Sequence, residues 1–202
     1  IEDVEGRKIF KKVCALSSQI ANIKNHNIIV VVHTSTPPFI LDKLGILYDV
    51  ILVVREMLAS YTNIEIAIEN CTLYNFVNKQ GLLHRQNATY IQDGKIKMAN
   101  VELAKMISHQ RCGVCFDTCH ALMTETHLMN DNKLFENYVK KMIGDKRIFT
   151  ELFEQSAPFL KLIHLAYSEN HGYDKYHGKA FTGQEFIVLK YINSLYNKNN
   201  LN

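Results

Sequence analysis

The stretch GVCFDTCHAL, residues 113–122, decides the fold because an apolar run leads directly into an acid and a histidine, Asp117 and His120. Apolar residues in unbroken succession are typical of a strand buried on both faces, as in a parallel sheet covered by helices. Three further runs share this character: NIIVVVH (27–33), IEIAIEN (64–70) and LKLIHL (160–165). Together with CGVCFD (112–117), they predict four buried parallel strands.

Segments with helical periodicity lie between these strands. In residues 5–24, apolar side chains recur at the spacing of one helix face, as at Ile9, Val13, Leu16 and Ile20. Further helices are predicted at 46–61, 100–108, 133–143, 146–156 and 183–196. Strands that alternate with helices predict right-handed βαβ crossovers and therefore an α/β fold.

The length of the chain bounds the architecture. Four strand–helix units fill the 202 residues, whereas a complete TIM barrel has eight and is typically about 250 residues long. We therefore predict a single domain over residues 1–202. It would be either an open α/β sheet or a partial (β/α) fold of TIM-barrel type, incomplete at both ends.

Composition excludes little. The formal net charge of +3 neither indicates nor rules out binding to nucleic acid. The apolar runs are too short to span a membrane, and no signal peptide is recognisable. Five cysteines are an odd number, and Cys112, Cys115 and Cys119 crowd one segment. We interpret them as reduced thiols of a cytoplasmic protein. The CGVC spacing lacks the second pair that a zinc ribbon needs.

Each predicted strand ends in a residue that can bind a metal: His33, Glu69, Asp117 and His164. Ligands bind at the carboxyl ends of parallel strands, where the following loops converge. Imidazole and carboxylate together suit zinc, manganese or a similar divalent cation. A single histidine there is more often structural, and Asp117 could instead cap the next turn. Recurrence at all four strand ends favours a metal site.

Other residues are predicted near this site. His120 would lie on the first turn after its strand, close enough to bind the same ion. His177, in the loop YDKYHGKAFTG, is a further candidate ligand, with Asp174 and His171 behind it as second-layer residues.

Several segments resemble a known superfamily. GVCFDTCHA (113–121) resembles the signature of endonuclease IV, the second family of AP endonucleases. IAIEN (66–70), VVVHTS (30–35) and the region 163–183 are similar to other strands and loops of the xylose isomerase-like TIM barrels. That superfamily includes sugar and sugar-phosphate isomerases and epimerases, and the resemblance extends over roughly residues 10–195.

The resemblance implies that Glu69, Asp117 and His164 hold a divalent metal (zinc, manganese or magnesium) in both branches of the superfamily. His33, His120 and His177 would be further ligands in a multi-zinc endonuclease. The chain departs from the endonuclease pattern after His164. It has HLAYSE where the family has His-x-Asn-Asp, and DKYH where the family has Asp-Arg-His.

Because of this departure, we rank a metal-dependent sugar or sugar-phosphate isomerase or epimerase first. Glu69 would be its catalytic base or a metal ligand, and a small sugar its substrate. The first alternative is an endonuclease IV-like zinc phosphodiesterase that cleaves DNA at abasic sites. The second is an inactive or partial barrel that serves as a binding module. We expect no membrane partner and leave homo-oligomerisation open.

Overall fold

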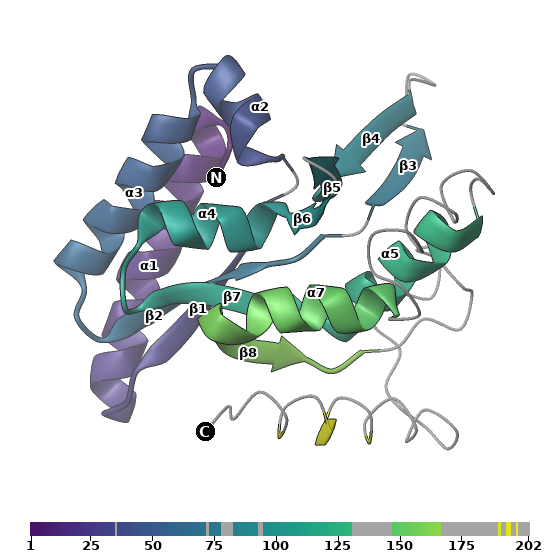
Figure 1. The fold of residues 1–202 in the computed structure, drawn as a ribbon. Coiled ribbons are helices and arrows are strands. Elements are labelled where there is room, and N and C mark those ends of the chain that lie inside the picture. The colour runs from purple at the N-terminus through teal and green to yellow at the C-terminus, as the bar shows by residue number, and fades with distance from the viewer. Residues whose placement is uncertain are drawn as a thin grey trace.

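The computed structural model describes residues 1–34, 36–71, 73–77, 83–92, 95–130, 147–166, 190, 193–194 and 197. Its main sheet has four parallel strands in the order β1-β2-β7-β8 (Figure 1). Their bounds are Ile28–His33, Ile64–Glu69, Cys112–Asp117 and Leu160–His164. They match the four apolar runs to within one residue at each end, which confirms an α/β fold with a parallel sheet. Closure into a TIM barrel stays a prediction.

Helices connect the strands. Their bounds are α1 Val4–Lys24, α2 Pro38–Lys43, α3 Leu47–Ser60, α4 Ala99–Ile107, α5 Thr118–Asn130 and α7 Ile148–Ser156, with a 3-10 turn at Ala157–Phe159. Four of them confirm predicted helices, and α2 and α5 were not predicted. The predicted helix 133–143 and most of 183–196 lie outside the described residues. In the described part of the chain, no helix is both long enough and apolar enough to cross a bilayer.

The main sheet has two chemically different faces because side chains alternate along each strand. One face carries Val30, Ile66, Val114 and Phe116, which pack with residues of α1, α3, α4 and α7 in one hydrophobic core. Phe116 contacts the rings of two α7 residues edge-on, with centroids 5.5 Å and 5.2 Å away. This burial is the main source of stability.

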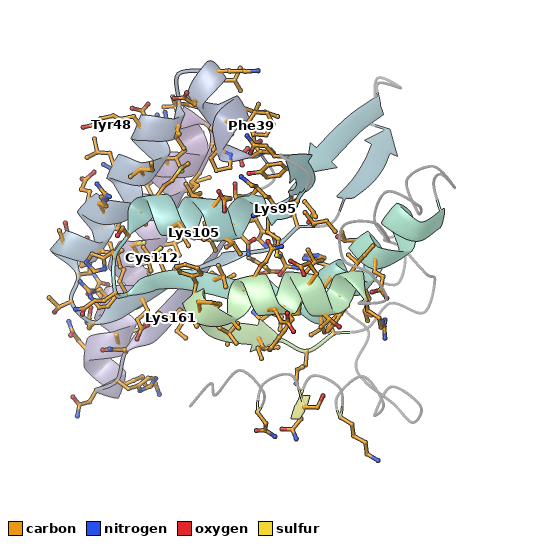
Figure 2. The ribbon with its side chains drawn as sticks, in the orientation of Figure 1. Phe39, Tyr48, Lys95, Lys105, Cys112 and Lys161 are labelled. Atoms are coloured by element: carbon orange, nitrogen blue, oxygen red, sulfur yellow. The ribbon has the colours of Figure 1, made fainter. Side chains whose placement is uncertain are left out.

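The other face of the sheet carries the polar strand-end residues. Register pairs His33 with Glu69, and Asp117 with His164, so these side chains share one face. Further from the strand ends, Glu65 on this face forms an ion pair with Lys161, whose position Figure 2 labels. Among the described residues, the helices that share the core cover the apolar face, and the strand-end cluster lies on the opposite face.

Two β-hairpins between β2 and α4 were not predicted. The first pairs β3, Leu73–Val77, with β4, Leu83–Asn87, and the second pairs β5, Thr89–Gln92, with β6, Lys95–Met98. The second hairpin is anchored to the body of the fold. The centroid of its Tyr90 ring lies 5.3 Å from that of Phe39 on α2. Figure 2 labels Phe39.

A β-bulge aligns the last strand with the site. The register between β7 and β8 shifts between Val114 and Cys115, so that one extra residue of β8 is accommodated before His164 comes opposite Asp117. Bulges redirect side chains in this way and are frequent beside functional sites. Without the shift, His164 would point toward the helix-covered face.

Close packing beside this bulge requires glycine at position 113. A Cβ there would overlap the carbonyl oxygen of Phe159 and come within 2.6 Å of Lys161 Cγ. Because the obstruction includes backbone, we expect Gly113→Ala to lower the free energy of unfolding by about 3 kcal/mol. Urea denaturation would measure this change.

Gly45→Ala is the matched control. A Cβ at Gly45 meets nothing within 4 Å, and only its φ of +70° opposes a side chain, a cost of about 1 kcal/mol. Equal losses of stability in the two variants would contradict the packing explanation.

Candidate metal centre

The four strand-end residues lie where the sequence predicts them. His33, Glu69, Asp117 and His164 are the last residues of β1, β2, β7 and β8. The parallel order of the strands brings these ends to one edge of the sheet. The described residues thus include a cluster of imidazoles and carboxylates at the carboxyl edge.

Glu69 is the centre of this cluster. Its Oε2 lies 3.1 Å from His164 Nδ1 and 3.4 Å from His33 Nε2, while its Oε1 lies 3.5 Å from His120 Nδ1. Glu69 is 3% exposed, so the carboxylate exchanges most of its water for imidazole nitrogens. Each carboxylate oxygen therefore faces different histidines.

Asp117 has two roles in the same place. Its Oδ1 accepts a hydrogen bond of 2.8 Å from the backbone N–H of His120, so the capping role considered from the sequence is present. Asp117 also belongs, with Glu69 and His120, to a buried group whose ligand atoms lie within 4.8 Å of one another. Capping and metal binding are compatible because Asp117 has a second oxygen, Oδ2.

The ring of His120 is oriented by the backbone. Its Nδ1 lies 2.6 Å from the carbonyl oxygen of Asn70. A hydrogen on Nδ1 that donates to this carbonyl leaves a lone pair on Nε2 for a metal ion. Such a backbone contact is the usual way in which proteins fix the tautomer of a ligating histidine.

Asn70 is a site residue that sequence reasoning missed. Its Oδ1 accepts a 2.6 Å hydrogen bond from the Asp117 N–H, and its Nδ2 donates to the Asp117 carbonyl at 3.1 Å. The side-chain amide thus continues the pairing of β2 with β7 beyond the last strand residue. The sequence shows only that Asn70 follows Glu69 directly in IAIEN, and this adjacency does not reveal its partners on β7.

Thr118, which directly follows β7, holds the end of β8 in place. Its hydroxyl shares one hydrogen between the carbonyl oxygens of Ala166 and His164, at 2.7 Å and 3.2 Å, and accepts from the Ala166 N–H at 3.0 Å. The backbone that carries His164 is therefore held to the first residue of α5. Nothing in the sequence marks this threonine.

Sulfur lies on two sides of the cluster. Cys71 Sγ is 3.4 Å from His33 Nδ1, and burial raises the pKa of the Cys71 thiol to about 12. Burial, followed by the nearby negative charges of Glu69 and Asp117, also raises the pKa of Cys115. All five cysteines of the chain are free and buried in the structure.

Three predicted residues cannot be placed. His171, Asp174 and His177 lie outside the described residues. Their roles as ligand or supporting residues stay predictions.

The donor set fits a divalent cation. Two buried carboxylates and three imidazoles converge, and backbone contacts hold Asp117 and His120 in place. Burying two carboxylates side by side is costly unless positive charge compensates them. A bound cation would supply that charge.

Comparison with known proteins adds no family. The chain matches no model of a known protein family and no curated protein at a significant level of similarity. Inference about its function therefore rests on the site.

Removing the Asn70 side chain should lower both the stability of the protein and its affinity for zinc. We expect Asn70→Ala to lower the free energy of unfolding by about 2–4 kcal/mol, because two buried backbone groups of Asp117 lose their partners. Zinc affinity, measured by isothermal titration calorimetry, should fall about 10- to 100-fold, as when other supporting residues of metal sites are lost.

Asn63→Ala provides the control at the far end of the same strand. The Asn63 amide also bridges elements, bonding the Ser18 hydroxyl and carbonyl of α1. This variant should lose stability and keep its zinc affinity. Equal affinity losses in both variants would mean that Asn70 acts only through general stability.

Proposed function

We propose that this protein is a divalent-metal hydrolase of the endonuclease IV type, which cleaves the phosphodiester backbone of DNA at abasic sites. The observation that carries the proposal is the arrangement around Glu69. One oxygen of this carboxylate faces His120, and the other faces His33 and His164. A buried carboxylate with imidazole rings on both sides is suited to be a metal ligand, and these residues would hold the cation.

The same arrangement weakens the case for a proton-transfer enzyme. A base that moves a proton between carbons must reach the substrate, yet Glu69 is 3% exposed and has imidazole nitrogens within 3.5 Å of both oxygens. Glu69 is thus better suited to be a ligand than a base. The sugar isomerase remains the second candidate because Glu69, Asp117 and His164, the residues that both branches share, lie together.

The donor set favours zinc. Three imidazoles with two carboxylates are typical ligands for this ion, whereas magnesium prefers oxygen alone. Zinc held by these residues would lower the pKa of a bound water and stabilise the charge that develops on a leaving oxygen.

The protein's own residues would bind and orient the substrate. The side chains of His33 and His164 are 59% and 39% exposed, whereas those of Glu69 and Asp117 are nearly covered. The imidazoles therefore form the accessible side of the centre, from which a phosphate could approach. The resemblance of residues 113–121 to the endonuclease signature supports abasic DNA as the substrate.

The direct test is cleavage of a synthetic duplex that contains one abasic site, with zinc present. We expect cleavage that a chelator abolishes and added zinc restores. Glu69→Gln should slow cleavage about a hundredfold or more, because an amide binds cations far less strongly than a carboxylate.

Glu65→Gln is the matched control. Glu65 lies on the same face of β2, but it pairs with Lys161 at 2.7 Å instead of a histidine. This variant should cleave at close to the wild-type rate. Zinc binding without cleavage of the abasic duplex, together with metal-dependent epimerisation of a ketose, would overturn the proposal in favour of the isomerase.

A further inference from the structure

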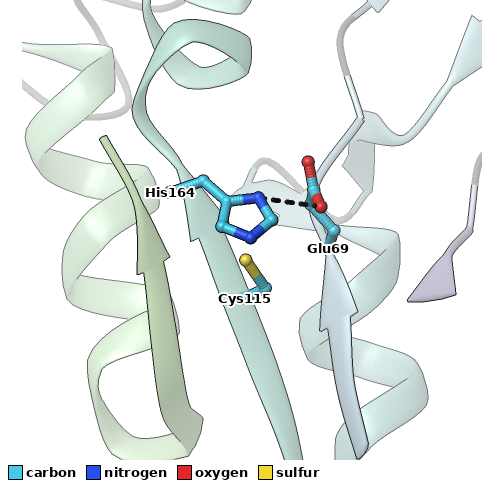
Figure 3. Close-up of side chains that lie close together, drawn as sticks. All are labelled: Glu69, Cys115 and His164. Carbon is cyan, nitrogen blue, oxygen red and sulfur yellow. Dashed lines mark ion pairs between the residues drawn. The ribbon is translucent and has the colours of Figure 1, made fainter. Parts of the chain in front are cut away.

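A sulfur donor lies against the same carboxylate. Cys115 is paired in register with Glu69 across β2 and β7, and its Sγ, a Glu69 oxygen and a His164 ring nitrogen all lie within 4.8 Å of one another. Figure 3 shows the three side chains close together, and its dashed line marks the ion pair between His164 and Glu69. The Nδ1 and Oε2 atoms of this pair are 3.1 Å apart. These atoms form a compact sulfur–nitrogen–oxygen group.

The direction of the Cys115 side chain follows from its position in the strand. Alternation along β7 places Cys115 on the face of Asp117, whereas Cys112 and Phe116 point to the other face and pack in the hydrophobic core. Cys115 is fully buried but lies outside that core. Its sulfur therefore borders the polar centre rather than the helices.

We propose that Cys115, Glu69 and His164 form a second metal-binding group, which selects a thiophilic divalent ion. This inference extends the proposed function, since Glu69 and His164 also belong to the proposed hydrolytic centre. The first group, Glu69, Asp117 and His120, offers oxygen and nitrogen only. Thiolate sulfur favours softer ions, so the two groups differ in the ions they prefer.

Binding at this group is an exchange of a proton for an ion. The thiol of Cys115 loses its proton to solvent as the sulfur bonds to the cation, while the imidazole of His164 contributes a ring nitrogen. No electron is transferred. Because Glu69 is shared, an ion held by Cys115 would compete with the oxygen–nitrogen group for this carboxylate.

The test uses Cd²⁺ as the probe, since a cadmium–thiolate bond gives an ultraviolet charge-transfer band that oxygen and nitrogen ligands do not. We expect the band to grow as Cd²⁺ is added to the metal-free protein. In Cys115→Ala the band should be lost, and the Cd²⁺ affinity from calorimetry should fall about tenfold or more.

Cys112→Ala is the matched control, because it removes a buried thiol from the same strand on the opposite face. It should keep the band, and circular dichroism should report a folded protein for both variants. A band that persists in Cys115→Ala, or that never forms in the wild type, would overturn the inference. Neither result depends on DNA cleavage. If Glu69→Gln loses cleavage but the wild type gives no cadmium band, the hydrolase proposal stands and this inference fails. If the wild type gives the band but does not cleave the abasic duplex, this inference stands and the hydrolase proposal fails.

Discussion

Two buried carboxylates at the ends of neighbouring strands impose the main constraint on this structure. Glu69 and Asp117 are each 3% exposed, and like charges that lose their water repel one another strongly. Around them the fold gathers groups that offset this cost: three imidazoles and the N–H of His120. The register of the strands, the bulge in β8 and the start of α5 all serve this arrangement.

The chemical difference between the two faces of the sheet, one apolar and one with the polar strand-end residues, follows from this constraint. Apolar residues pack against the helices and supply most of the stability, so the opposite face can tolerate charge. If the charged centre lay on the same face as the core, the helices packed there would also remove its water, at a further cost in free energy. Alternation along each strand keeps the two demands apart with a period of two residues.

The sequence predicted the strand ends well for a physical reason. An apolar run fixes where a buried strand lies, and a polar residue that closes the run is carried to the sheet edge with it, as at His33 and Glu69. The hairpins were missed because β3 to β6 are short and mix polar with apolar residues, so they lack a clear period.

Asn70 and Thr118 could not be assigned from the sequence because both act on backbone groups of distant residues. Their partners become neighbours only once β2, β7 and β8 have paired. Cys115 is a different case. Its spacing of two residues from Asp117 puts both on one face of a strand, but the CGVC spacing also suits a cysteine pair, so the sequence does not single out Cys115 as a ligand.

The separation of the site residues along the chain bears on how the protein folds. Asn70 and Asp117 are 47 residues apart, and Thr118 and His164 are 46 apart. Parallel pairing over such distances requires large loops to close before any contact is gained, which makes folding slow. During synthesis β1 and β2 leave the ribosome well before β7 exists, with unpaired edges and apolar faces exposed. The centre is thus assembled late, and cells that make this protein would have to keep its early strands from aggregating until β7 and β8 arrive.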